Sequence, residues 1–119
     1  MVQKSTIVYP LDKCNVNSVN VFHLYYGFNR KFSFSGDFIK SSIRSVEPES
    51  LLNKKSKVKG MVIRTKYPIK KKDGSFLKFT TNNVILLKKR MNSYGVRLGG
   101  PVPFQIKRKK FVNSFPGII

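Results

Sequence analysis

Lysine and arginine side chains are concentrated in residues 58–102, where the pattern predicts a two-stranded hairpin. Two β-type runs, residues 61–65 and 75–79, flank a turn at Asp73-Gly74, where both residues tolerate a positive φ. Asp73 alone opposes the cations of this hairpin, which are Arg64, Lys66, Lys70, Lys71, Lys72 and Lys78. Lysine ammonium groups bind phosphate as point charges and position a protein on nucleic acid without reading its sequence. We therefore expect the hairpin to project toward a polyanion.

Further cations lie in three other groups. They are Arg30 with Lys31; Lys54, Lys55, Lys57 and Lys59; and Lys107, Arg108, Lys109 and Lys110. A lone arginine, Arg97, stands between Gly95 and Gly99-Gly100, small residues that let a phosphate backbone come close. Because the groups are separate, we expect nucleic acid to approach from more than one side.

The whole chain is strongly basic. Its 119 residues contain 24 Lys and Arg against 5 Asp and Glu, a formal net charge of +19. A polyanion relieves such self-repulsion, so nucleic acid is the first candidate partner and an anionic membrane surface the second. The cations are spread along the chain instead of following one amphipathic helix, which favours nucleic acid. No apolar run reaches the ~20 residues that span a bilayer, and residues 1–9 lack a secretory-signal layout.

Few residues could support catalysis or bind a metal. Cys14 and His23 are the single cysteine and histidine, too few for an internal disulfide or a structural zinc site. The acidic residues fall at expected turns and loops without an acid-base pair: Asp12, Asp37, Glu47, Glu49 and Asp73. We expect no enzyme, no cofactor and no metal site.

Strand patterns dominate and must position the cations. The expected strands are residues 6–9, 18–26, 37–46, 58–67 and 82–87. Spacing of roughly ten residues without long helical patterns predicts an antiparallel barrel or sandwich. The aromatic residues expected to face its core are Phe22, Phe38 and Phe79. Packing on RNA or on a neighbouring protein is left open for Tyr67, Phe104 and Phe115.

Residues 58–102 resemble the universal large-subunit ribosomal protein fourteen family in the order and spacing of short motifs. The matching pieces are Lys59-Gly60, Val62-Ile63-Arg64-Thr65, Lys70-Lys71-Lys72, Asp73-Gly74-Ser75, Leu77-Lys78-Phe79, Asn82-Asn83-Val84, Gly95-Val96-Arg97 and Gly100-Pro101-Val102. Residues 36–40 are similar to the family's Gly-Asp step into its third strand. The likeness covers nearly the whole chain, although residues 12–15 depart from the family's turn and the loop at residues 47–57 is longer than the bacterial form.

The resemblance implies one domain, residues 1–119, that is mostly β: a small closed five-stranded antiparallel β-barrel. A projecting β-ribbon is expected at about residues 61–80, and a C-terminal loop with short helices at about residues 95–119. Residues 103–110 would supply one of those helices. The resemblance also implies a structural constituent of the large ribosomal subunit that binds large-subunit rRNA and neighbouring large-subunit ribosomal proteins. Because the family's Gly-x-Arg faces the small subunit, Arg97 is expected to meet small-subunit rRNA and a ribosomal silencing factor.

Composition bears on the compartment. The chain has no alanine and is rich in Lys, Phe, Asn and Ile, whose codons are A/T-rich. With no visible presequence, this favours a gene carried in a mitochondrion and a place in the mitochondrial ribosome. A plastid-type organelle or a bacterial cytoplasm is the alternative.

Two other functions fit a basic β-rich chain. A free-standing single-stranded nucleic-acid-binding β-barrel would carry exposed aromatics on adjacent strands of one face, whereas most aromatics here follow the inward periodicity. A peripheral membrane protein would need an exposed helix with apolar and basic faces, and the sequence shows none.

Overall fold

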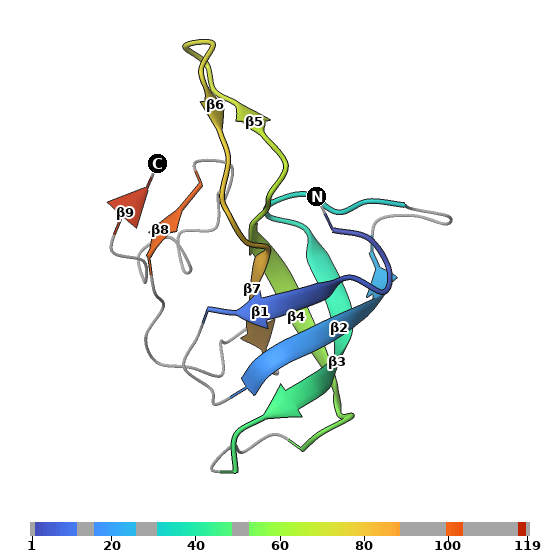
Figure 1. Ribbon diagram of the computed structural model, residues 1–119. Coiled ribbons are helices and arrows are strands. Elements are labelled where there is room, and N and C mark those ends of the chain that lie inside the picture. Colours follow the sequence, from blue (N-terminus) through green and yellow to red (C-terminus); the bar gives the residue numbers. More distant parts are fainter. Residues whose placement is uncertain are drawn as a thin grey trace.

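A closed five-stranded β-barrel forms the centre of the computed structural model (Figure 1). The structure describes residues 2–11, 16–25, 31–48, 53–88, 100–103 and 117–118. The barrel strands are β1 (Ile7–Pro10), β2 (Val16–Leu24), β3 (Phe38–Val46), β4 (Lys57–Arg64) and β7 (Asn83–Leu87). Each lies within two residues of an expected strand at its start, so the predicted barrel is confirmed.

The barrel closes through a parallel pair, which corrects the expectation of a wholly antiparallel barrel. Neighbours pair antiparallel from β1 through β2, β3 and β4 to β7. β1 and β7 then pair in parallel, with Tyr9 opposite Asn83 and Pro10 opposite Val84. The physical reason is parity: strand directions that alternate around a ring of five bring the first and fifth strands together pointing the same way.

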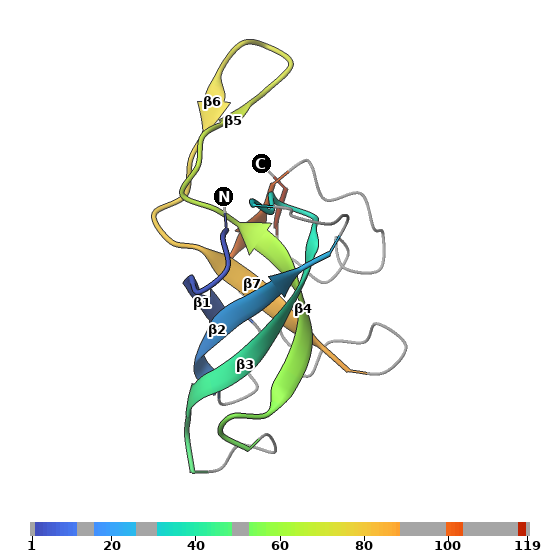
Figure 2. The same ribbon diagram turned by 90° about the vertical axis from the view of Figure 1, so that its right-hand side faces the viewer.

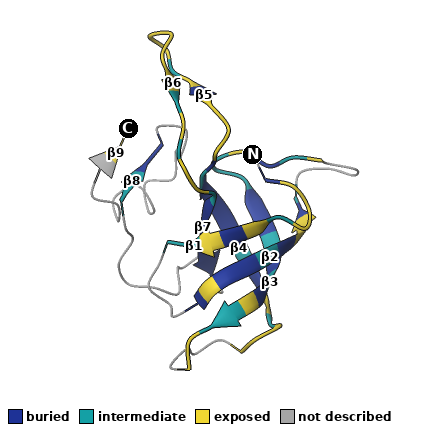
Figure 3. Ribbon diagram, viewed as in Figure 1, coloured by how far each residue is buried: buried dark blue, intermediate teal, exposed yellow. Residues whose placement is uncertain are grey.

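Alternating residues fill the barrel interior. Val8, Val21, Ile39, Val62 and Leu86 belong to one buried cluster that joins all five barrel strands. Side chains of a strand alternate between its two faces, so their neighbours point away from this interior. On β2 and β1 these neighbours are largely exposed, whereas β4 and β7 are buried on both sides (Figure 3).

A second apolar cluster explains why β4 and β7 are buried on their outer faces. Met61, Ile63, Ile85 and Leu87 pack there with Phe38 and with Val102 of β8 (Pro101–Val102). β8 pairs in parallel with β9 (Gly117–Ile118). A short piece of the C-terminal region therefore covers the barrel beside β7 (Figure 2).

A two-stranded ribbon of β5 (Ile69–Lys70) and β6 (Phe76–Leu77) projects from one end of the barrel (Figures 1 and 2). Gly74 has a φ of 89°, so the predicted turn is confirmed. The predicted first limb, residues 61–65, is wrong. Residues 61–64 belong to β4, where apolar side chains are buried on both faces between β3 and β7, and the chain reaches the ribbon only after Pro68.

The expected core position of Phe22 is wrong, and the expected C-terminal helix stays a prediction. Phe22 is 41% exposed and not in the core, because Val21 points inward and the pairing of β2 with β3 shifts register between Val21 and His23. Phe38 is buried as expected. The described residues contain no helix, so none there could cross a membrane. The helix expected at residues 103–110 lies, apart from Pro103, outside the described residues.

Candidate nucleic-acid interface

The tip of the ribbon presents lysines on a turn that Asp73 organises. The backbone N–H and the hydroxyl of Ser75 both donate to Asp73 Oδ1, at 3.0 and 2.6 Å. The Ser75 hydroxyl bond, then its backbone bond, lower the pKa of Asp73, and the positive charge of Lys71 adds to this. The only acidic residue among those described in the ribbon is thus engaged within the turn, while Lys70 and Lys72 extend into solvent.

Other predicted cations of the ribbon region are also accessible. Lys66 and Lys78 are exposed, and the backbone N–H of Lys66 donates to Asn82 Oδ1 at 2.9 Å, which fixes the base of the ribbon. Lys31 is exposed near the start of the segment that leads to β3. These placements agree with a solvent-facing basic ribbon.

A second group lies where β3 connects to β4, at the opposite end of the barrel from the ribbon (Figure 1). Lys54, Lys55 and Lys57 are exposed there. Lys59 differs, because its Nζ lies 5.2 Å from the centre of the Tyr25 ring and 4.8 Å from that of Phe38. Such cation–π contacts hold an ammonium against the barrel wall. The exposed lysines of the ribbon and those between β3 and β4 therefore lie at opposite ends of the barrel, not on one face.

Arg64 has a partner inside the protein. Its Nε donates to the carbonyl oxygen of Pro101 at 2.9 Å, and its guanidinium lies 5.7 Å from the centre of the Phe79 ring. Burial lowers its pKa from the ordinary value. Gly100, with a φ of 74°, lies so close that a Cβ would overlap the guanidinium. Arg64 thus fixes the C-terminal segment on the barrel, a role that its place in the sequence did not indicate.

Some predicted site residues cannot be placed. Arg30, Arg97, Lys107, Arg108, Lys109 and Lys110 lie outside the described residues, as do Phe104 and Phe115. No cluster of His, Cys, Asp and Glu that could hold a metal occurs within the described ranges.

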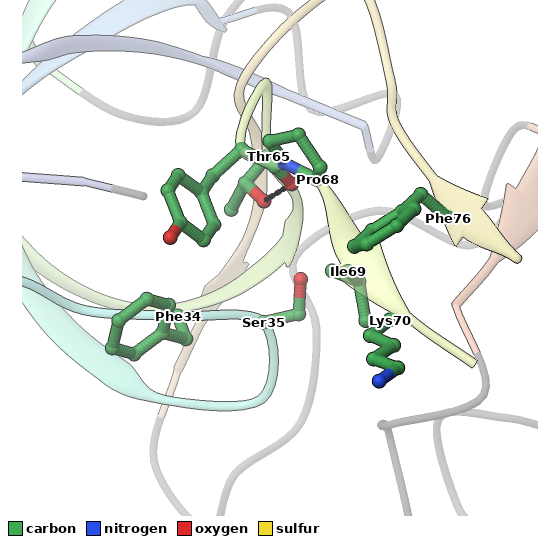
Figure 4. A pocket seen from close by; sticks show the side chains of 8 residues that line it. Phe34, Ser35, Thr65, Pro68, Ile69, Lys70 and Phe76 are labelled. Atoms are coloured by element: carbon green, nitrogen blue, oxygen red, sulfur yellow. Dashed lines mark hydrogen bonds between the residues drawn. The ribbon is translucent and has the colours of Figure 1, made fainter. Parts of the chain in front are cut away.

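Sequence reasoning missed an aromatic pocket at the base of the ribbon. It has a volume of about 350 Å³ and is lined by Phe34, Ser35, Thr65, Tyr67, Pro68, Ile69, Lys70 and Phe76 (Figure 4). The sequence singles out Tyr67 as an aromatic of open placement, but not Phe34 or Phe76. One sequence feature could have pointed to Phe34 and Phe76: each is an aromatic residue next to a serine, in a segment with a weak strand pattern.

Comparison with known proteins decides the family. The sequence model described as "Ribosomal protein L14p/L23e" matches residues 1–115. The chain belongs to this ribosomal protein family. It is also 45% identical over 119 residues, all of both chains, to "Large ribosomal subunit protein uL14m" of Tetrahymena pyriformis.

Membership in the L14p/L23e family confirms the predicted resemblance, and this family of structural ribosomal proteins is not an enzyme class. The likeness to uL14m also confirms the predicted mitochondrial location.

Proposed function

We propose that the protein is a structural constituent of the large subunit of the mitochondrial ribosome and holds large-subunit rRNA through lysine contacts to phosphate. The observation that carries this proposal is the L14p/L23e match in a chain of formal net charge +19. Neighbouring large-subunit ribosomal proteins would also contact it. The uL14m name of the relative supports the same subunit.

Separated lysine groups suit a protein that is embedded in folded RNA. The ribbon lysines and the lysines between β3 and β4 lie at opposite ends of the barrel, so one nucleic-acid strand crossing one face would not meet both. Lysine contacts to phosphate fix position and orientation without sequence readout. Sequence preference would then come from the shape of the rRNA.

Salt dependence tests this mode of binding. Affinity of the full chain for protein-free large-subunit rRNA should fall steeply with salt, because phosphate contacts release counterions. The double variant Lys70→Gln/Lys72→Gln should reduce the slope of log K against log salt by about 0.7 to 0.9 for each phosphate that is no longer neutralised. The matched control is Lys4→Gln/Lys88→Gln, two exposed lysines outside the predicted groups. Equal slopes for wild type and ribbon variant would count against the ribbon as a phosphate-binding element.

A place at the subunit interface is part of the proposal. We propose that the Gly-x-Arg motif of Arg97 faces the small subunit and binds small-subunit rRNA and a ribosomal silencing factor; the resemblance to the family supports this. Arg97→Glu should lower the share of the protein in joined ribosomes more than its share in free large subunits. An unchanged distribution, with normal binding of the factor, would exclude this role for Arg97.

The structure gives little support to the alternative function, a free-standing barrel that binds single-stranded nucleic acid. Tyr9 on β1 and Phe22 on β2 are exposed on adjacent strands. Ile7 lies opposite Asn20 in the antiparallel pair, so the position on β1 opposite Phe22 precedes Tyr9 by four residues. The two rings are therefore separated by about 13 Å along the strands. These two rings do not form a continuous stacking platform.

A further inference from the structure

The pocket at the base of the ribbon gathers exposed aromatic rings. Phe34, Tyr67 and Phe76 are 43%, 49% and 67% exposed, although large apolar rings ordinarily gain by burial. The rings of Phe34 and Tyr67 meet edge to face, with centres 6.1 Å apart. Phe34 and Phe76 stand on opposite sides of the pocket (Figure 4). The arrangement leaves ring surface available to a flat ligand.

Hydrogen bonds and burial hold the walls of the pocket in place. Asp37 Oδ2 accepts the backbone N–H of Phe34 at 2.8 Å, which fixes the turn that carries this ring. On the other side, Thr65 is buried and its hydroxyl donates to the carbonyl oxygen of Tyr67 at 3.4 Å (Figure 4). Ile69, in strand β5 of the ribbon, is buried. Pre-organised walls reduce the entropy lost when a ligand binds.

Ser35 supplies a polar group that has no partner among the described residues. Its Oγ is buried, and it stands between Phe34 and Ile69 on the floor of the pocket (Figure 4). A buried hydroxyl without a hydrogen bond is costly. The Oγ is closed to solvent, so a ligand with a polar edge gains this hydrogen bond only when the Ser35 side chain turns toward the pocket. Lys70 adds a cation to the lining. The pocket therefore combines ring faces, one free hydroxyl and one positive charge.

We propose that this pocket takes a single unstacked base of the large-subunit rRNA. The base would lie against the aromatic rings, and its phosphate would lie near Lys70. Its polar edge would pair with Ser35 Oγ once this side chain has turned toward the pocket. An apolar side chain of a neighbouring protein would satisfy the rings alone and leave both the hydroxyl and the lysine without partners. The inference rests on the proposed rRNA-binding function and names one nucleotide contact within it.

Fluorescence offers a direct test, because the chain contains no tryptophan. The Tyr67→Trp variant places one indole in the pocket, and Tyr9→Trp places one on an exposed strand position outside it. Titration with protein-free large-subunit rRNA should quench the first by about half or more and leave the second nearly unchanged, because stacking on a base quenches indole. Equal responses of the two variants would overturn the proposal.

Affinity separates the pocket from the wider function. The double variant Phe34→Leu/Phe76→Leu, which keeps apolar bulk without ring faces, should bind the same rRNA about 5- to 150-fold more weakly. Ser35→Ala should weaken binding as well. Phe22→Leu, an exposed aromatic outside the pocket, is the matched control and should bind as wild type.

The outcomes distinguish the two claims. If wild type binds tightly and the pocket variants bind equally tightly, the base pocket is wrong while rRNA binding stands. If wild type itself shows no salt-sensitive affinity for the rRNA, the proposed function fails and the pocket proposal fails with it. If the fluorescence of the Tyr67→Trp variant is quenched only after ribosomal proteins are added to the rRNA, the pocket binds a neighbouring protein, and the proposal that it binds an rRNA base is wrong.

Discussion

Arg64 and Gly100 are the residues that join the C-terminal segment to the barrel. The guanidinium of Arg64 lies between the Phe79 ring and the Gly100-Pro101 backbone, and Val102 then enters the outer apolar cluster. Sequence reasoning assigned Arg64 to phosphate because it saw a cation in a basic stretch. Its hydrogen bond to the carbonyl oxygen of Pro101 joins residues 37 positions apart, and no local sequence pattern indicates such a bond.

Substitution of Gly100 tests this junction. Gly100→Ala should lower the free energy of unfolding by about 1 to 3 kcal/mol, because the residue combines a positive φ with overlap of the new Cβ and Arg64. Gly74→Ala is the matched control: its φ is also positive, but nothing lies within 4 Å of the added Cβ, so only backbone strain of about 1 kcal/mol remains. Urea unfolding measures both. Equal losses of stability would show that Arg64 does not constrain Gly100.

Asp73 gives a pH-dependent prediction for the ribbon turn. Hydrogen bonds from Ser75 depress the pKa of Asp73 in the folded state. A depressed carboxyl pKa stabilises the turn above the unfolded pKa, and this stabilisation is lost as pH falls through the folded pKa. Ser75→Ala should raise the pKa of Asp73 toward its ordinary value in an NMR titration, whereas Ser45→Ala in β3 should leave it unchanged. A wild-type pKa already at the ordinary value would contradict this account of the turn.

The sequence was most informative about the positions of the strands. Alternation and turn residues located all five barrel strands, because one face of each strand had to be apolar. The pairing of β1 with β7 follows from the number of strands and could have been deduced. The ribbon limb was misplaced because residues 61–65 are apolar and β-branched enough to suit either a ribbon or a central strand, and only the cover supplied by Val102 distinguishes the two.

The ribbon should be separable from the barrel. Ile69 pairs with Leu77, so residues 70–76 can be replaced by a two-residue Asn-Gly hairpin turn. The shortened chain should unfold with a free energy within about 0.5 kcal/mol of wild type and bind large-subunit rRNA more weakly, since it lacks Lys70, Lys71 and Lys72. Circular dichroism with urea, alongside the binding titration, checks both. Global unfolding on removal of the ribbon would show that it is part of the core.

The molecule as a whole carries its charge around a small apolar barrel. A net charge of +19 on 119 residues disfavours a compact isolated chain and favours one enclosed by a polyanion. Composition and strand spacing predicted a basic β-rich protein that binds a polyanion, and the resemblance of the ordered motifs predicted the family. The aromatic pocket could not be predicted from the sequence, because it forms only where residues 34–35 contact the ribbon, which is distant in the sequence.

Sedimentation of the endogenous protein tests the central claim most directly. Mitochondrial extract is washed at high salt and separated on a density gradient, and the protein is followed by immunoblotting together with large-subunit rRNA. A structural constituent of the large subunit should migrate with that rRNA in the free subunit and in joined ribosomes. Recovery of the protein at the top of the gradient, apart from large-subunit rRNA, would contradict the account.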